Sequence, residues 1–181
     1  MTIQETSLPG VLLITPRIFR DPRGSFQETF NLRAMVEAGL PAQWAQDNFS
    51  VSRKNVLRGI HYQTVHPQGK LVRVAFGAVL DVVVDLRRSS PTFGRHVAVE
   101  LSGDNGHMLW IPEGFGHSFL TLSEEAGFAY KVTDYYSAAG ERTILWNDPD
   151  LAIEWPVRAA DVIVSEKDRQ GLRLRDAEVF A

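Results

Sequence analysis

Residues 79–101, VLDVVVDLRRSSPTFGRHVAVEL, decide the fold that we predict for this chain. Val79–Leu86 and His96–Leu101 are short runs rich in β-branched residues, and the turn-forming sequence SSPTFG separates them. Short β-branched runs between turn signals favour strands over helices. The stretch therefore predicts two β-strands joined by a loop.

Similar runs lie on both sides of this stretch, and their apolar residues mostly recur with a period of two. They are Val11–Ile18, Ser25–Phe30, Gln46–Ser52, Leu57–Gln63, Lys70–Phe76, Met108–Ile111, Phe119–Leu122 and Phe128–Tyr136. The one helical stretch is Asn31–Ala38, with Asn31 placed as its N-cap and Gly39 as its stop. About ten short strands predict an all-β jelly roll or sandwich of two antiparallel sheets, whose interior could hold a small ligand. From Asn147 onward the chain is rich in Pro, Asp and Arg, and we expect it to wrap the barrel as loops and single turns.

The length and composition indicate an ordinary soluble protein. The 181 residues suffice for one domain, 1–181, with a core and a cavity. A net charge of -3 gives no indication of nucleic acid or a membrane surface as a partner. The absence of cysteine excludes a disulfide framework and thiolate chemistry and fits a reducing compartment. The sequence shows neither a signal peptide nor an apolar run of the about 20 residues that cross a bilayer, so we expect a cytoplasmic location.

The segment 56–74, VLRGIHYQTVHPQGKLVRV, places Arg58, His61 and Lys70 in two strand-like runs. Such groups are unfavourable to bury in apolar strands, which indicates a function. The set suits removal of a proton from a carbon next to a carbonyl group. In that reaction His61 would take the proton, Lys70 would hold the oxyanion, and Arg58 would bind an anionic substrate. Taken alone, however, a strand histidine is more often a hydrogen-bonded structural residue.

Strand parity raises a difficulty for this set. On an ideal strand, His61 shares a face with Gly59, whereas Arg58 lies on the opposite face. A bulge at Gly59 would re-aim one of the two side chains, or the long Arg58 stem could reach around the strand. The sequence does not choose between these arrangements.

The histidines do not form a metal-site pattern. A metal-binding double-stranded β-helix needs His-x-His, a carboxylate and a further histidine, but Tyr62 and Gln63 follow His61. We therefore predict no catalytic metal. His117, in PEGFGHSF, suits a pocket wall and the surface equally well.

Three more candidates have an ordinary structural explanation when taken alone. Asp168, in SEKDRQG, has the surroundings of a solvated acid. A catalytic histidine, however, needs a partner on its other ring nitrogen, and Asp168 could be that partner. Tyr130 and Tyr136 share strand parity, so they could face one cavity or could be core aromatics.

The segment PRIFRDPRGSFQETF supplies Phe19, Arg23, Phe26 and Glu28. Arg23 and Phe26 suit phosphate pairing and base stacking, although a charged hairpin with an aromatic staple explains them as well. No P-loop, Rossmann glycine pattern or nucleophile elbow is present.

Taken together, these segments resemble one family, the dTDP-4-dehydrorhamnose 3,5-epimerases of bacterial nucleotide-sugar metabolism. The matching sequences are FRDPRGSFQETF, QDNFSVS, VLRGIHYQ, QGKLVRV, VVDLRRSSPTFG, LWIPEGFGHSFLTLS, YKVTDYY, LWNDPDLAIEWP and SEKD, in the family's order over nearly the whole chain. The departures are TVHPQG in place of a more Pro-rich loop before the lysine, and HSF where HGF is common. The resemblance implies a double-stranded β-helix of the cupin type with short helical segments. It also implies a homodimer that works without a metal or other cofactor.

The resemblance assigns roles by position. His61 would be the base, with Asp168 as its orienting partner. Tyr130 would be the acid on the opposite face of the sugar, and Lys70 would stabilise the enolate oxygen. The candidate substrate-binding residues are Arg23, Glu28, Gln46, Asn48, Arg58, His117, Glu141 and Lys167, together with Phe19, Phe26 and the thymine-stacking Tyr136. Of these, Arg23 and Glu28 would act across the dimer interface, in the partner's site.

The implied reaction inverts C3 and C5 of dTDP-4-dehydro-6-deoxy-D-glucose and gives dTDP-4-dehydro-L-rhamnose, a step of dTDP-rhamnose biosynthesis for cell-wall polysaccharide. The alternatives are a single-centre deoxysugar epimerase, a ketoisomerase, a non-catalytic nucleotide-sugar binding module and a metal-dependent sugar-phosphate isomerase. The joint presence of His61, Lys70, Tyr130 and Asp168 favours the 3,5-epimerase, because binding alone does not require an acid–base pair.

Overall fold

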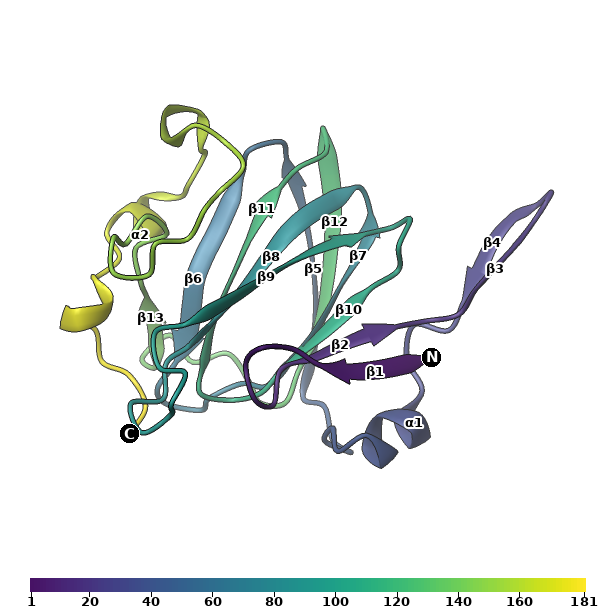
Figure 1. The fold of residues 1–181 in the computed structure, drawn as a ribbon, viewed down its shortest axis with the longest axis horizontal. Helices are drawn as coiled ribbons and strands as arrows, with labels where there is room; N and C mark the ends of the chain where they lie inside the picture. The colour runs from purple at the N-terminus through teal and green to yellow at the C-terminus, as the bar shows by residue number, and fades with distance from the viewer.

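Two antiparallel sheets face each other, and a separate two-stranded hairpin projects from them (Figure 1). The computed structural model describes all residues, 1–181. Strands that are neighbours within a sheet often lie far apart in the chain, as they do in a jelly roll. The predicted all-β jelly roll with short helical segments is confirmed.

The strands follow one another in space in this order. The six-stranded sheet consists of β1 (Thr2–Glu5), β2 (Leu12–Thr15), β10 (Met108–Ile111), β7 (Lys70–Phe76), β12 (Glu125–Val132) and β5 (Gln46–Arg53). The five-stranded sheet consists of β13 (Glu141–Thr143), β6 (Leu57–Gln63), β11 (Phe115–Thr121), β8 (Ala78–Asp85) and β9 (His96–Ser102). The hairpin pairs β3 (Ile18–Asp21) with β4 (Gly24–Gln27). The helical segments are α1 (Leu32–Glu37), α2 (Glu166–Arg169) and the 3-10 turns η1 (Ala159–Asp161) and η2 (Leu174–Asp176).

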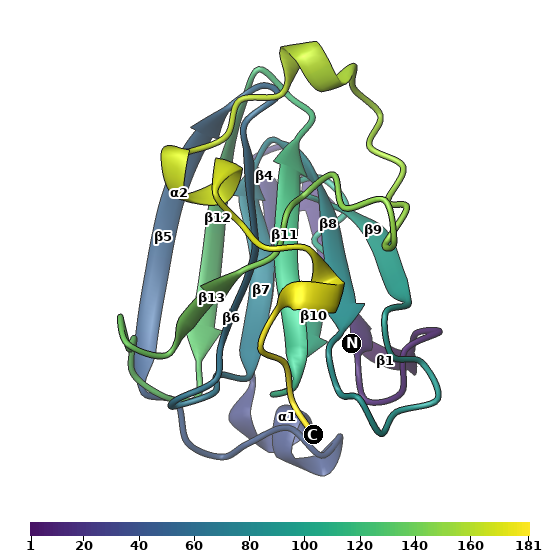
Figure 2. The same ribbon diagram turned by 90° about the vertical axis from the view of Figure 1, so that its left-hand side faces the viewer.

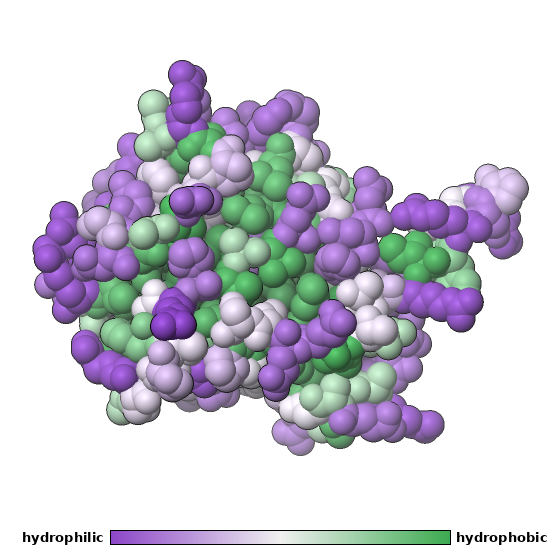
Figure 3. All heavy atoms as spheres, viewed as in Figure 1, coloured by the Kyte–Doolittle hydropathy of each residue, from purple (hydrophilic) through white to green (hydrophobic).

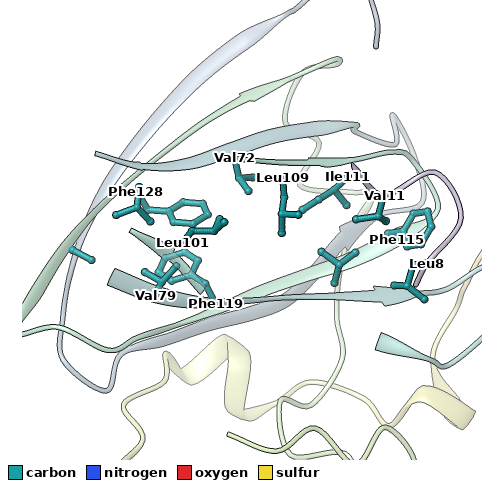
Figure 4. Packing of buried hydrophobic residues seen from close by; sticks show 13 residues of the cluster. Leu8, Val11, Val72, Val79, Leu101, Leu109, Ile111, Phe115, Phe119 and Phe128 are labelled. Atoms are coloured by element: carbon teal, nitrogen blue, oxygen red, sulfur yellow. The ribbon is translucent and has the colours of Figure 1, made fainter. Parts of the chain in front are cut away.

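A cluster of 13 buried apolar residues packs between the two sheets (Figure 4). Val72 and Phe128 enter it from the six-stranded sheet, and Val79, Val83 and Phe119 enter it from the five-stranded sheet. The Phe119 and Phe128 rings stack with their centroids 4.2 Å apart. Because side chains alternate along a strand, polar residues that share parity with these positions also face the interior.

Two smaller apolar clusters attach the remaining segments to the outer faces of the sheets. Met35 of α1 packs with Leu71 on the six-stranded sheet. Leu151 and Leu174 of the C-terminal segment pack with Val82 on the five-stranded sheet. Figure 2 shows this segment crossing the face formed by β13, β6 and β11. The expected wrapping of the barrel by the C-terminal portion is confirmed. None of the helices has the length and apolar character of a membrane-spanning segment.

Strand boundaries differ from the prediction in four places, one of which is β11 (Phe115–Thr121), predicted as Phe119–Leu122. The expected strand Val11–Ile18 is interrupted at Pro16, which has no backbone N–H for the ladder, and β2 and β3 form on either side. The expected strand Ser25–Phe30 already ends with β4 at Gln27. The expected strand Phe128–Tyr136 is shifted, because β12 begins earlier and gives way after Val132 to a turn. The short strands β1 and β13 were not predicted.

The helix α1 begins and ends where the sequence indicated. The side chain of Asn31 accepts a hydrogen bond from the Ala34 backbone N–H at 3.2 Å. Gly39 adopts a φ of +87°, a left-handed conformation that favours glycine after a helix.

The β3–β4 hairpin extends away from the two sheets (Figure 1), and hydrophobic residues are exposed on it (Figure 3). Phe19 is 50% exposed and Phe26 is 71% exposed, with ring centroids 6.5 Å apart. Exposed aromatic pairs of this kind often mark a contact surface.

Candidate active site

A cavity of about 560 Å³ lies between side chains of both sheets and of α2. Its walls include nine of the residues that the sequence singled out: Arg58, His61, Lys70, His117, Tyr130, Tyr136, Glu141, Lys167 and Asp168. Ser50, Phe119 and Phe128 complete part of the wall with smaller or apolar groups. The cavity thus combines apolar walls with a small set of polar groups, as ligand sites do.

A bulge in β6 brings Arg58 and His61 to the same cavity. On β11, Phe119 pairs with Arg58 and His117 pairs with His61, so β6 has one residue more than β11 between these pairs. The register shift falls at Gly59, whose φ is +118°. A Cβ added to Gly59 would lie 2.5 Å from the His117 carbonyl oxygen, so only glycine permits this close approach of the strands. Of the two arrangements left open by the sequence, the bulge is the one observed.

His61 and Asp168 form a close pair although they are 107 residues apart in the chain. The His61 Nε2 lies 2.5 Å from Asp168 Oδ1, and the Asp168 side chain is almost fully buried. Burial raises the pKa of Asp168, but hydrogen bonds from His61, Ser165 and Gly59 outweigh it, so the pKa lies below its usual value. The carboxylate therefore stays ionised and accepts the Nε2 proton, which leaves the His61 Nδ1 free to take a proton.

The position of Asp168 depends on the short helix α2. The Ser165 side chain caps this helix by accepting the Asp168 backbone N–H at 3.1 Å. The Gly59 backbone N–H donates to the second carboxylate oxygen at 3.5 Å. The C-terminal segment thus carries Asp168 to the bulge of β6 and fixes it there.

Lys70 lies at the start of β7 and points into the cavity with the same parity as Val72. Burial lowers the pKa of Lys70, and the negative charges of Asp81 and Glu141 offset part of this effect, so that the pKa is about 8. The ammonium form is therefore retained at neutral pH. An ammonium group in a partly apolar wall is suited to stabilise an oxyanion.

Tyr130 lies on the inner face of β12, next to Phe128. Burial raises the pKa of Tyr130, the nearby Arg58 lowers it, and Glu141 raises it, with a net increase. The phenol is therefore protonated at neutral pH and can donate a proton. Of the two interpretations left open for Tyr130 and Tyr136, a shared cavity is the one observed, although β12 ends at Val132 and strand parity therefore does not extend to Tyr136.

Glu141 connects two side chains at the exposed side of the cavity. It accepts a hydrogen bond from the Tyr136 hydroxyl at 2.9 Å and pairs with the Lys167 ammonium at 2.6 Å. Burial raises the pKa of Glu141, but these two partners outweigh it and lower the pKa overall. Tyr136 remains 58% exposed, so its ring is available to stack on a planar group.

His117 is buried at the back of the cavity. Its Nε2 lies 2.8 Å from Oδ2 of Asp81, and its ring stacks on Phe128 with centroids 5.8 Å apart. Of the two sequence interpretations, the pocket wall is therefore the one observed.

His61, Lys70 and Tyr130 thus line one cavity. Comparison with known proteins identifies the family of the chain. Residues 5–176 match the family described as dTDP-4-dehydrorhamnose 3,5-epimerase. A protein of that name from Pseudomonas aeruginosa is 51% identical over 181 residues, which covers 99% of each chain. The chain belongs to the dTDP-4-dehydrorhamnose 3,5-epimerase family.

Two solved structures resemble this chain over nearly its whole length. The RmlC epimerase from Legionella pneumophila, solved in complex with dTDP-4-keto-L-rhamnose, superposes with a TM-score of 0.94 at 47% identity, covering 98% of this chain and 94% of that one. ChmJ, a 3'-monoepimerase from Streptomyces bikiniensis in complex with dTDP-quinovose, has a TM-score of 0.88 at 35% identity, covering 94% and 86%. This chain therefore shares its cupin-type fold with both of these proteins.

Other predicted residues of this epimerase-family chain lie outside the cavity. Phe19, Arg23 and Phe26 are on the projecting hairpin, and Arg23 pairs locally with Asp21 at 2.6 Å. Glu28 follows the hairpin and accepts a hydrogen bond from Asn31 at 3.2 Å. The cavity is formed without these side chains.

Gln46 and Asn48 also lie outside the cavity walls. They are neighbours on the inner face of β5, where Gln46 Nε2 donates to Asn48 Oδ1 at 2.7 Å. Ser50, two residues further along the same face, does line the cavity. Gln46 and Asn48 therefore extend the polar face of β5 beyond the cavity.

Sequence reasoning missed Asp81, the buried partner of His117. The signal was present, because Asp81 has the same strand parity as the inward-facing Val79 and Val83. A carboxylate at an inward position of an apolar strand is unfavourable unless it has a partner, the same argument that singled out His61 and Lys70.

Proposed function

We propose that this chain, as a single domain, is a dTDP-4-dehydrorhamnose 3,5-epimerase that inverts C3 and C5 of dTDP-4-dehydro-6-deoxy-D-glucose. The observation that carries the proposal is the shared cavity of the His61–Asp168 pair, Lys70 and Tyr130. These groups supply a base, an oxyanion partner and an acid. The reaction as proposed therefore uses only side chains of the protein.

His61 acts as the base. The C4 ketone of the substrate acidifies the hydrogens on C3 and C5, and neutral His61 removes one of them through Nδ1. The Asp168 Oδ1 lies 2.5 Å from Nε2 of His61, accepts its proton in a hydrogen bond and stabilises the imidazolium that forms. A positioned base of this kind contributes about 10²–10⁴-fold to the rate.

Lys70 stabilises the enolate. Removal of the proton places negative charge on the C4 oxygen, and the Lys70 ammonium offsets this charge within a partly apolar wall. A preorganised donor of this kind contributes about 3–4 kcal/mol.

Tyr130 returns a proton to the opposite face of the sugar. One base alone tends to return the proton to the face from which it came, so inversion needs a second group. The raised pKa of Tyr130 keeps the phenol protonated until the enolate forms. Proton exchange with solvent then returns His61 to its neutral form and Tyr130 to the phenol, and the same steps at the second carbon give dTDP-4-dehydro-L-rhamnose.

The remaining side chains of the cavity suit a nucleotide sugar. The guanidinium of Arg58 and the ammonium of Lys167 can pair with a diphosphate, and Tyr136 can stack on thymine. Glu141 holds Tyr136 and Lys167 together, so it fixes the two groups that bind opposite ends of the nucleotide.

The projecting hairpin completes the site of a partner subunit in a homodimer. Arg23 and Phe26 are too exposed for a role within one chain, and Arg23 is suited to phosphate. Mixing Arg23→Ala subunits with His61→Asn subunits tests this, because a mixed dimer contains one site with both native residues. We expect each variant alone to be weakly active, and subunit exchange to restore about a quarter of the wild-type activity. Activity no greater than the sum of the two variants would exclude shared sites.

Conversion of the dTDP-keto sugar in deuterium oxide tests the proposed reaction. We expect deuterium at both C3 and C5 of the product, read by NMR, and no exchange with His61→Asn. Label at C3 alone would identify a single-centre epimerase, and movement of the carbonyl would identify a ketoisomerase. Tight dTDP binding without exchange at any carbon would leave only a binding module.

A further inference from the structure

Asp81 of β8 is a buried carboxylate with too few partners for a structural residue. It is fully buried, and its Oδ2 lies 2.8 Å from Nε2 of His117. Its other oxygen, Oδ1, is buried without a hydrogen-bond partner. Leaving a buried carboxylate oxygen unpaired is unfavourable, so packing alone does not explain an aspartate here.

Asp85, on the same strand, shows what a structural carboxylate looks like. It is equally buried, but it pairs with Arg87 at 2.8 Å and accepts hydrogen bonds from the hydroxyls of Ser90 and Thr92 at 2.6 Å each. Those partners fix the loop that follows β8. Asp81 has no comparable set of hydrogen-bond partners. It contacts His117, and its charge influences Lys70, and both of these residues line the cavity.

The charge of Asp81 favours the protonated form of Lys70. Burial alone lowers the pKa of Lys70, and among the nearby charges Asp81 opposes this most strongly, followed by Glu141. Glu141 is already paired with the Lys167 ammonium at 2.6 Å, so part of its charge is compensated. Asp81, by contrast, has no ammonium or guanidinium group in an ion pair, and its one side-chain partner is His117.

We propose that Asp81 is a positioning residue for the epimerase reaction, which holds His117 in one tautomer and supplies the counter-charge of the Lys70 ammonium. This inference rests on the proposed function, because Lys70 is the group that meets the enolate. The Asp81 carboxylate accepts the Nε2 proton of His117, and the Nδ1 lone pair of His117 is then available to accept a hydrogen bond from a sugar hydroxyl. Asp81 itself transfers no proton.

Other groups around the cavity also contribute to the field at Lys70. They are Arg58 and His61 of β6, His117 of β11, Tyr130 of β12, Tyr136, Glu141 of β13, and Lys167 and Asp168 of α2. The test must therefore change Asp81 alone and leave this set intact.

The variant Asp81→Asn keeps the size of the side chain and removes its charge. The basic limb of the pH profile of kcat/KM reports deprotonation of Lys70, and we expect it to move down by about one pH unit. At pH 8 this shift lowers the protonated fraction of Lys70 about fivefold, so we expect kcat/KM at that pH to fall about fivefold or more. Asp81→Glu keeps the charge, and we expect it to retain the basic limb of the wild type even if kcat falls.

The matched control is Asp85→Asn. It removes an equally buried charge from the same strand, so we expect a lower Tm and an unchanged basic limb. If Asp81→Asn also lowers Tm but leaves the basic limb in place, Asp81 is only structural and the inference is wrong. Wild-type activity in deuterium oxide is measured in parallel, so that failure of the proposed reaction is seen separately, in the unaltered protein.

A second measurement applies even if Asp81→Asn does not fold. ¹⁵N NMR of histidine-labelled wild-type protein reads the tautomer of His117 without substrate. We expect a protonated Nε2 and an unprotonated Nδ1. The opposite tautomer would show that the Asp81 carboxylate does not accept this proton, and the inference would be withdrawn.

Discussion

Replacing Asp168 with asparagine tests the role of the His61–Asp168 pair with a change of one atom. The carboxylate can only accept a hydrogen bond, so it fixes the proton of His61 on Nε2 and leaves Nδ1 free as the base. An asparagine amide can instead donate to Nε2. His61 would then carry its proton on Nδ1 and could not remove one from the sugar.

The expected loss follows from the geometry of the pair. The hydrogen bond is 2.5 Å long and involves a nearly buried carboxylate, so its removal lowers the stability of the imidazolium by about 1.5–3 kcal/mol. That free energy corresponds to about 10–200-fold in rate. The change of tautomer adds to it, so we expect kcat to fall by about 10²–10⁴-fold, with a smaller change in KM.

The assay is the initial rate of conversion of the dTDP-keto sugar, followed by NMR, with thermal unfolding to verify the fold. The control is Asp161→Asn, a half-buried residue of the same C-terminal segment whose side chain pairs with Arg158, at 2.6 Å. We expect the control to retain wild-type activity. If folded Asp168→Asn keeps kcat within a few-fold of the control, the pair does not orient the base and the reasoning fails.

Two further predictions concern Lys70 and Gly59. Lys70 has a pKa of about 8 and must be protonated to act, so kcat/KM should fall about tenfold per pH unit above that value. Lys70→Met should abolish this basic limb of the pH profile and lower kcat about 10²–10³-fold. A basic limb that persists in the variant would show that another group causes it. Gly59→Ala places a Cβ 2.5 Å from a backbone oxygen at positive φ, so we expect a loss of about 3 kcal/mol and a fall in Tm of about 6–12 °C. The control is Gly24→Ala, because Gly24 has a φ of +127° but no atom lies within 4 Å of the added Cβ. An equal loss of Tm in this control would show that the positive φ, and not the close approach of the strands, causes the effect.

The strands of the barrel could be predicted because their signals are local. Alternation and turn residues predict strands at 46–52, 57–63 and 70–76, close to the observed limits of β5, β6 and β7. The errors occurred where a local signal was absent or misread, as at Pro16 and at the short strand β13. Two- to four-residue strands have little pattern of their own, and their pairing depends on neighbours that are distant in sequence.

The site was less accessible to sequence reasoning, because it depends on long-range contacts. The bulge at Gly59 was one of two options, and only the pairing of β6 with β11 decides between them. Asp168 lies in a polar stretch that gives no sign of burial, and the residue reaches His61 only because the C-terminal segment folds back over the sheet. Its role was inferred from family resemblance, whereas Asp81 had a readable parity signal that was overlooked.

The most direct test of the account separates the roles of His61 and Tyr130 in deuterium oxide. With Tyr130→Phe, we expect deuterium to enter the recovered substrate while inverted product falls sharply, because His61 still removes the proton and the acid on the opposite face is missing. With His61→Asn, we expect no deuterium at either carbon. Exchange that persists in His61→Asn and disappears in Tyr130→Phe would contradict the assignment of base and acid.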